Sequence, residues 1–192
     1  MQSKRQARLQ TVASQRQAGF IVVLEDIHDP HNAAAILRTC DAFGVQDVWF
    51  IFNQEKAYNP KRVGKSSSSS ANKWLTFRVF KSVTECKAAL KKLKYQSVGT
   101  VLRKGAEDFT KAKLTAKRIA LWVGNEHAGL SEEASAACDR LLLLPMRGFV
   151  ESLNVSVMTA ICVYEIFRQR AGRKYQRSPR EASVILKEFL ER

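Results

Sequence analysis

Short runs of consecutive apolar residues alternate along the chain with longer stretches in which apolar residues recur every three or four positions. Continuous apolar runs are typical of strands that are buried on both faces, as in parallel sheets. The strands predicted in this way are Phe20–Leu24, Val48–Phe52, Thr76–Phe80, Ser97–Leu102, Ile119–Val123 and Leu141–Leu144. Helices are predicted over Val83–Leu93, Ser131–Cys138 and Asn154–Arg168. This alternation predicts an α/β fold with a mainly parallel sheet and helices on both faces.

A further helix is predicted directly after the first strand. We expect Asn32 to be its N-cap, because asparagine side chains accept hydrogen bonds from the free N–H groups of a first helical turn. Ile36, Cys40 and Phe43 then share one face, and Gly44 suits the position that follows the end of a helix.

The composition restricts the class of protein. The chain has 192 residues, of which 45% are hydrophobic, which suits one domain with a core and is too apolar for an intrinsically disordered chain. No apolar run approaches the roughly 18 residues needed to cross a bilayer, so we expect no membrane partner. We expect residues 20–168 to form the domain, 1–19 a basic N-terminal arm and 169–192 a basic C-terminal extension.

The chain carries 32 lysine and arginine residues against 18 aspartate and glutamate residues, and its net charge of +14 favours a polyanionic partner such as nucleic acid. Residues 20–55 carry one basic and six acidic side chains, and residues 119–164 carry two basic and five acidic ones. Residues 56–118, in contrast, carry seventeen basic and three acidic side chains. Two acidic segments therefore interrupt an otherwise basic chain.

Cysteine and histidine spacing indicates no metal site. The four cysteines are at least twenty residues apart, so we interpret them as reduced core residues of a cytoplasmic protein. The three histidines are not spaced like zinc ligands. The first 19 residues are rich in arginine but lack the apolar core of a secretory signal, so we interpret them as an arm that faces RNA.

Common nucleotide-binding motifs are absent from the sequence. No GxGxxG follows the first predicted strand, and Gly64-Lys65 lacks the upstream glycine of a P-loop. Three other segments follow predicted strands: residues 29–39 (DPHNAAAILRT), 123–130 (VGNEHAGL) and 144–156 (LPMRGFVESLNVS). Ligands of open parallel sheets bind at the carboxyl ends of the strands, so these segments are the candidate site.

In this order and separation, the three segments resemble the motifs of the SpoU/TrmH family of RNA ribose 2′-O-methyltransferases, within the SPOUT superfamily. The resemblance covers residues 20–168 and implies a deep trefoil knot in the C-terminal third, with S-adenosylmethionine as the methyl donor. The extensions Arg5–Arg8 and Arg168–Arg170 look like those of the branch that methylates guanosine 18 in the D-loop of tRNA. The positions that match the cofactor-binding residues of the family are Thr100, Leu102, Gly124, Leu144, Met146, Ser152, Leu153 and Asn154.

The same resemblance implies a catalytic set of Arg38, Asn32, Glu126 and Asn154. On position alone, Arg38 is a surface arginine that would pair with Asp41, three residues later. An arginine side chain stays protonated, so we expect Arg38 to orient the ribose hydroxyl or an RNA phosphate rather than to act as the base. Asn154 also suits a helix cap. Glu126 is expected to pair with an arginine, of the same chain or across a dimer interface, because a carboxylate beside RNA needs a cation.

Several basic residues outside the motifs are expected to contact RNA phosphates. They are Arg5, Arg8, Arg16, Lys65, Arg168 and Arg170. For the N-terminal arginines, solvated side chains are the alternative. Leu186 and Phe189 are expected to pack against other residues rather than to contact RNA.

The last predicted helix is apolar around much of its circumference, which indicates burial in the core or against a second copy of the chain. Family members are homodimers, so the partners implied by the resemblance are tRNA and a second copy. Two other functions stay open: ribose methylation of ribosomal RNA or of another tRNA position, and RNA binding without catalysis.

Overall fold

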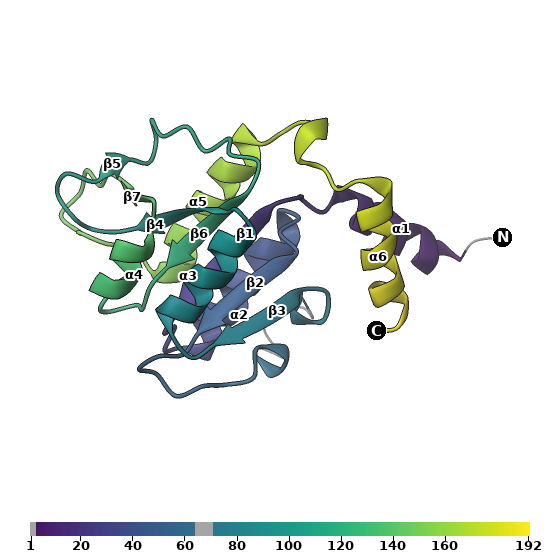
Figure 1. Ribbon diagram of the computed structural model, residues 1–192, viewed down its shortest axis with the longest axis horizontal. Coiled ribbons are helices and arrows are strands. Elements are labelled where there is room, and N and C mark those ends of the chain that lie inside the picture. Colours follow the sequence, from purple (N-terminus) through teal and green to yellow (C-terminus); the bar gives the residue numbers. More distant parts are fainter. Residues whose placement is uncertain (1–2, 64–70) are drawn as a thin grey trace.

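The computed structural model describes residues 3–63 and 71–192, and a seven-stranded sheet runs through it (Figure 1). The strands are β1 (Phe20–Glu25), β2 (Asp47–Ile51), β3 (Thr76–Phe80), β4 (Gln96–Thr100), β5 (Glu107–Asp108), β6 (Ile119–Val123) and β7 (Arg140–Leu143). They lie in the order β3-β2-β1-β6-β4-β7-β5, and all the pairings between these strands are parallel. The predicted fold class is confirmed.

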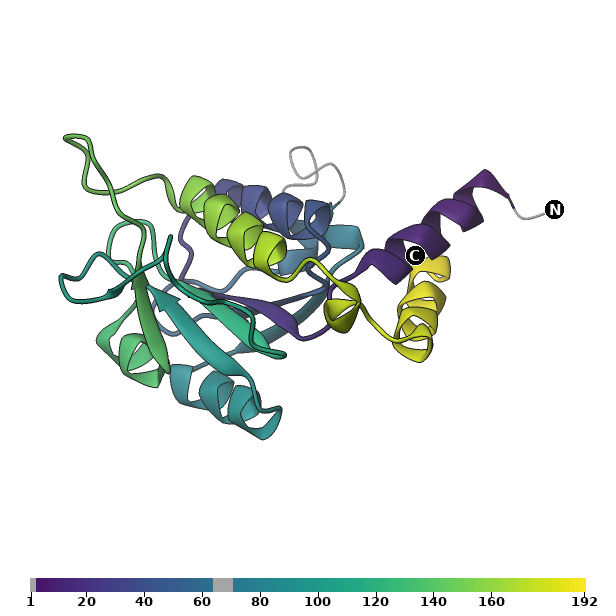
Figure 2. The same cartoon turned by 90° about the horizontal axis from the view of Figure 1, so that it is seen from above.

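Helices cover both faces of this sheet, as predicted (Figure 2). They are α1 (Lys4–Gln15), α2 (Pro30–Ala42), α3 (Val83–Lys92), α4 (Glu132–Ala137), α5 (Val155–Gln169) and α6 (Pro179–Leu190). Helices α2 and α5 lie side by side on one face, and α3 and α4 lie on the other. Single 3-10 turns occur at Pro60–Arg62, Ala71–Lys73 and Arg173–Tyr175.

The central strand β1 contributes to the core on both of its faces. Phe20, Val22 and Leu24 belong to the apolar cluster beneath α2 and α5. Ile21 and Val23 belong to the cluster beneath α3 and α4. Successive side chains of a strand point to opposite faces, so an unbroken apolar run is what a strand covered by helices on both sides requires.

The start of α2 corrects the prediction for Asn32. The N-cap is Asp29, whose carboxylate accepts a hydrogen bond from the backbone N–H of His31 at 2.8 Å, and Pro30 occupies the first helical turn. Proline suits that position because its missing N–H would have had no helical partner. Asn32 therefore lies inside the first turn, and its side chain is free for other contacts. Gly44 follows the helix with a φ of 74°, as predicted.

The two ends of the chain pack together beside the sheet. Helices α1 and α6 lie against each other (Figure 1) and share a small apolar cluster that includes Leu9, Ala13 and Ile185. Phe189 is fully buried there and Leu186 packs at its edge, so the packing role predicted for both residues is confirmed. Helix α6 was not among the predicted elements, although Ser178 and Glu181 form a capping box at its start.

The strand order places β6 between β1 and β4, so the chain crosses the middle of the sheet late in its course. The trefoil knot implied by the family resemblance stays a prediction. None of the helices in the described residues is both long and apolar enough to cross a bilayer.

Candidate active site

The loops that follow β1, β4, β6 and β7 meet at the carboxyl end of the sheet and enclose two adjoining cavities. The first, which we call the apolar cavity, has a volume of about 300 Å³ and takes most of its wall from apolar side chains. Seven of the eight predicted cofactor-binding residues line it: Thr100, Leu102, Gly124, Leu144, Met146, Ser152 and Leu153. The eighth, Asn154, lines the second cavity instead.

This second cavity, which we call the polar cavity, has a volume of about 600 Å³. Its walls bring Asn32, Glu126 and Asn154 together with His28 and Asp29. The two cavities have five lining residues in common, from the loop after β6 and from the segment that runs from β7 into α5. These residues are Glu126, His127, Ser152, Leu153 and Val155. A molecule in the apolar cavity would therefore lie next to one in the polar cavity.

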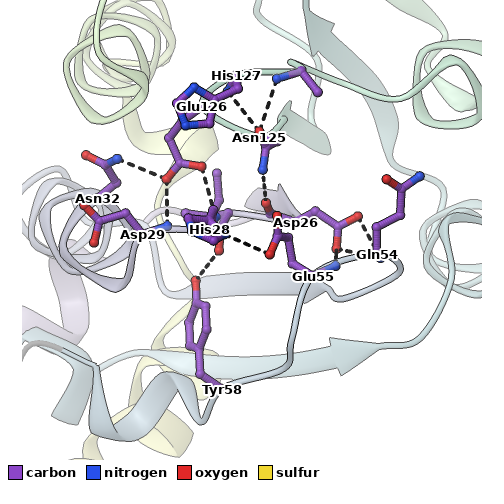
Figure 3. A network of polar contacts seen from close by, with 12 residues as sticks. Asp26, His28, Asp29, Asn32, Gln54, Glu55, Tyr58, Asn125, Glu126 and His127 are labelled. Atoms are coloured by element: carbon purple, nitrogen blue, oxygen red, sulfur yellow. Dashed lines mark hydrogen bonds and ion pairs between the residues drawn. The ribbon is translucent and has the colours of Figure 1, made fainter.

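Gly124 lets the backbone of the loop after β6 fold closely over the end of that strand. A Cβ atom on Gly124 would lie 2.1 Å from the carbonyl carbon of Gly129, which is far inside van der Waals contact. The loop between them is closed by reciprocal backbone hydrogen bonds between Asn125 and Gly129, at 3.0 and 2.9 Å. The Asn125 side chain ties this loop to β1, because its Nδ2 donates to the carbonyl oxygen of Asp26 at 2.8 Å (Figure 3).

Glu126 accepts three hydrogen bonds from the loop after β1 and the start of α2 (Figure 3). The donors are the backbone N–H of His28 at 2.9 Å, the backbone N–H of Asp29 at 3.1 Å and Nδ2 of Asn32 at 3.0 Å. Partial burial acts to raise the pKa of Glu126, but these donors outweigh it and hold the pKa below its usual value. In the described residues Glu126 has no ion pair and its donors are amides, so its pairing with an arginine across a dimer interface stays a prediction.

A second amide connects this network to α5. Asn154 is the N-cap of α5, because its Oδ1 accepts from the backbone N–H of Ser156 at 2.8 Å. Its Nδ2 donates to Oδ1 of Asn32 at 3.0 Å. The chain of contacts from Glu126 through Asn32 to Asn154 therefore joins three segments that lie 94 and 122 residues apart in sequence.

Comparison with known proteins identifies this arrangement of segments. The model of the SpoU rRNA methylase family matches residues 19–164. The chain belongs to this family. In the described residues no three His, Cys, Asp or Glu side chains are grouped as a metal site would require.

Individual SpoU relatives match over most of their length. A Thermus thermophilus protein named tRNA (guanosine(18)-2′-O)-methyltransferase is 39% identical over 86% of this chain and 83% of its own. The Escherichia coli K12 protein of the same name is 35% identical over 88% of this chain and 72% of its own. The crystal structure of the Aquifex aeolicus TrmH/SpoU tRNA modifying enzyme superposes with a TM-score of 0.87, at 31% identity, over 98% of this chain and 96% of that one.

Arg38 lies on the exposed surface of α2 and lines neither cavity of this SpoU family member. Its guanidinium makes no hydrogen bond or ion pair with any residue that the structure describes. The pairing with Asp41 that its position allowed is not formed, because Asp41 binds Arg16 instead. Arg38 is thus a free cation on the helix that carries Asn32.

Two arginines that we expected at the RNA surface are buried, which corrects that expectation. Arg16 is 1% exposed, with its guanidinium on the Asp41 carboxylate and on the backbone carbonyls of Asp41 and Val45. Arg170 is 2% exposed and donates to the carbonyls of Ala18 and Ala116. Burial lowers the pKa of Arg170 to about 10. Arg16 ties the end of α1 to α2 and to the segment before β2, and Arg170 ties the end of α5 to the segments before β1 and β6. Arginine suits both places because a guanidinium can satisfy several backbone carbonyls at once.

The other predicted RNA-binding residues have different surroundings. Arg5 and Arg8 are exposed on α1, and Arg168 is exposed on α5, where it forms a two-pronged ion pair with Glu165. Lys65 lies outside the described residues.

One pair of side chains at the polar cavity has no counterpart among the predicted site residues. Nδ1 of His28 lies 2.9 Å from Oε2 of Glu55, in the loop after β2. The two residues are 27 positions apart, and neither belongs to a spacing pattern that would mark it. The only signal in the sequence is that His28 follows the first predicted strand and directly precedes the first motif segment, residues 29–39.

Proposed function

We propose that this protein transfers a methyl group from S-adenosylmethionine to the ribose 2′-hydroxyl of guanosine 18 in tRNA. The observation that carries the proposal is the joint position of Asn32, Glu126 and Asn154 in a polar cavity that shares a wall with the apolar cavity. The substrate is supported by the relatives that carry this name in Thermus thermophilus, Escherichia coli and Aquifex aeolicus, which match 86–97% of the chain.

The residues of the apolar cavity fit S-adenosylmethionine. A related SpoU methyltransferase, AviRb from Streptomyces viridochromogenes, is crystallised with this cofactor and superposes with a TM-score of 0.70 at 27% identity, over 82% of this chain and 60% of that one. Gly124 has no side chain to obstruct the loop that closes the cavity, and Thr100 and Ser152 add hydroxyl groups to a mostly apolar lining. When bound, the cofactor would supply an electrophilic methyl group at the wall between the cavities.

The polar cavity would hold the ribose. Asn32 and Asn154 fix each other's amide groups, and Glu126 fixes the loop after β1, so a nucleoside would meet preorganised polar groups rather than mobile ones. Arg38 would bind an RNA phosphate beside the target ribose, because its guanidinium is free and planar. Replacing Arg38 with lysine would keep the charge but lose the fork, and we expect turnover to be abolished. Near-normal turnover of Arg38→Lys would exclude this role.

Basic side chains outside the cavities would hold the rest of the tRNA. Arg5 and Arg8 on α1, with Arg168 at the end of α5, are exposed and suit phosphate contacts. Lys91 and Lys92 are exposed at the end of α3 and form part of its solvated face.

The exposed face of α5 supports a homodimer. Val157, Ile161, Tyr164 and Phe167 follow one another at helical spacing and are each between 39% and 51% exposed. An exposed stripe of four large apolar residues on one helix is typical of a surface that another chain covers.

We also propose a cytoplasmic location. Cys40, Cys86 and Cys162 are buried as free thiols, and Cys138 is partly buried and also free. Burial raises the pKa of the Cys86 thiol to about 12, so its reactive thiolate form is suppressed. Such thiols are typical of a protein of reducing compartments.

The test is mass spectrometry of nucleosides after purified protein is incubated with unmodified tRNA and S-adenosylmethionine. We expect 2′-O-methylguanosine in tRNA digests, at position 18, and its loss when position 18 carries a 2′-deoxyribose. Methylation of ribosomal RNA fragments alone would move the substrate to the ribosome. Calorimetry that detects no binding of S-adenosylmethionine would instead indicate an RNA-binding protein without catalysis.

A further inference from the structure

Methylation of a ribose hydroxyl requires a group that takes up the hydroxyl proton, and the predicted catalytic set does not provide one. A guanidinium is not a base at physiological pH, Asn32 and Asn154 carry no titratable group, and the carboxylate of Glu126 already accepts three hydrogen bonds. Building on the function proposed above, we propose that His28 is the general base and that Glu55 orients it. This assignment rests on the geometry of the pair and on its place at the cavity that would hold the ribose.

The contact between His28 and Glu55 fixes which ring nitrogen is free. Nδ1 of His28 is 2.9 Å from Oε2 of Glu55, and an ionised carboxylate can only accept a hydrogen bond. Nδ1 therefore carries the hydrogen, and the neutral ring presents the lone pair of Nε2. His28 is among the residues that line the polar cavity with Asn32 and Asn154, and its side chain is 65% exposed, so a nucleoside can reach it. A carboxylate that orients an imidazole in this way is a recurrent device for proton transfer.

The backbone of Glu55 and of the two residues before it is held in place by hydrogen bonds to Asp26 (Figure 3). The buried carboxylate of Asp26 accepts the backbone N–H groups of Asn53, Gln54 and Glu55, at 2.8, 3.1 and 3.1 Å. Asp26 also has a φ of 49°, a conformation that a non-glycine residue rarely adopts. The backbone of His28 is held as well, because its N–H donates to Glu126. Both members of the pair are thus attached to the strand ends that form the site.

The other titratable groups around this cavity are less suited to accept the proton. Glu126 already accepts three hydrogen bonds and its pKa is lowered, and Asp29 is the N-cap of α2. The Tyr58 hydroxyl donates to the carbonyl of Ile27 at 3.1 Å. The side chain of His127 has no hydrogen bond or ion pair within the described residues that would orient it.

The charged groups that face His28 all favour its protonated form. The hydrogen bond that His28 donates to Glu55 and the charge of Glu55, followed by the charges of Glu126 and Asp29, raise the pKa of His28 above its usual value. A base whose pKa lies near the working pH is both free to accept a proton and strong enough to hold it.

In the proposed step, a lone pair of O2′ forms the bond to the methyl carbon while the bond from that carbon to sulfur breaks. The electron pair of the broken bond remains on sulfur, which becomes neutral. The O2′ proton passes to Nε2 of His28, directly or through one water molecule. The imidazolium is stabilised by Glu55 and returns its proton to solvent, to which the ring is exposed.

Single-turnover methylation of unmodified tRNA between pH 5.5 and 9 tests the inference. For the wild type we expect the logarithm of the rate to rise with pH at unit slope and to level off above the pKa of His28. His28→Asn should lower the plateau by about 10²- to 10⁴-fold and remove the inflection, because a general base contributes that much. Glu55→Gln should move the inflection to lower pH. Added imidazole should partly restore His28→Gly.

The matched control is His31→Asn, which alters an exposed histidine on α2 that lines neither cavity. This variant should keep the wild-type inflection. Dissociation constants for tRNA and S-adenosylmethionine are measured in parallel and should change less than twofold in His28→Asn. An unchanged pH profile in His28→Asn would overturn the role of His28 while the proposed function stands, and so would a loss of rate matched by a loss of tRNA affinity. Absence of methyl transfer by the wild-type protein would instead overturn the proposed function and, with it, this inference.

Discussion

Arg16 and Arg8 lie on or next to the same helix, yet the structure predicts opposite effects when each is replaced with alanine. Arg16→Ala removes the buried guanidinium that pairs with Asp41 and donates to the carbonyl of Val45 at 3.4 Å. It also removes the contact with the Phe189 ring, whose centroid is 5.6 Å from the guanidinium carbon. Arg8 is exposed and has no side-chain partner among the described residues.

The expected magnitude follows from burial. Breaking a buried ion pair costs about 3–5 kcal/mol, because the remaining charge loses its partner. The Asp41 side chain is 33% exposed and can regain water, so the lower end of this range, about 3 kcal/mol, applies to Arg16→Ala. In a chain of this length that corresponds to a melting temperature lower by about 6–12 °C. Arg8→Ala should change the free energy of unfolding by less than about 0.5 kcal/mol.

Urea denaturation and tRNA binding over a potassium chloride series separate the two outcomes. Arg16→Ala should shift the denaturation midpoint, and the folded fraction should bind tRNA with the wild-type salt dependence. Arg8→Ala should keep the midpoint and, if it loses one phosphate contact, reduce the slope of log affinity against log salt by about 1. Wild-type stability with weakened tRNA binding in Arg16→Ala would refute the structural role assigned to this residue.

Three further predictions follow from the site and the surface. Gly124→Ala should destabilise the fold by about 1–3 kcal/mol and weaken S-adenosylmethionine binding, because the added Cβ would clash with backbone atoms. Gly148→Ala should change neither property, because a Cβ at Gly148 would have no atom within 4 Å. Urea titration measures the stability of both variants, and calorimetry measures their binding of the cofactor. Ile161→Lys should yield a monomer in sedimentation experiments, whereas Val184→Lys on α6 should leave the dimer intact. A dimer in both variants would exclude the exposed face of α5 as the dimer interface. The pKa of Glu126 is lower in the folded protein than its usual value of 4.5, so the ionised carboxylate stabilises the fold at pH values above 4.5. This stabilisation is lost as the pH falls through the lower pKa of the folded state. Glu126→Gln should therefore flatten acid unfolding below about pH 5, and an unchanged acid limb would contradict this.

The strands were predictable because each central one is covered on both faces. The apolar run of β1 places no polar side chain on either face of the sheet, so it indicates a strand between two layers of helices. Strand β5 has only two residues, too few to form a pattern. The start of α2 was misplaced because Asn32 and Asp29 are both good caps, and only Pro30 distinguishes them.

The contacts of the site could not be predicted from spacing. Asn32 meets Glu126 across 94 residues and Asn154 across 122, and only the parallel crossing of the sheet brings these loops together. The family resemblance supplied those residues without their partners. The burial of Arg16 was equally hidden, because its acceptors are backbone carbonyls and a carboxylate 25 residues away. An arginine in a basic segment looks the same in sequence whether it binds RNA or the protein itself.

The acidic character of the two site segments has a structural explanation in the partners of their carboxylates. Asp26 accepts three backbone N–H groups, Glu126 accepts two and an amide, and Glu25 accepts the N–H and hydroxyl of Ser131. These carboxylates bind backbone N–H, amide and hydroxyl donors of the strand-end loops, so they fix the loops without recruiting basic side chains into the site. Arg38 is consequently left free for a phosphate, and His28 keeps a carboxylate partner of its own in Glu55. A site with net negative charge can therefore accept an anionic substrate, because its carboxylates are hydrogen-bonded to the loops that would surround the ribose.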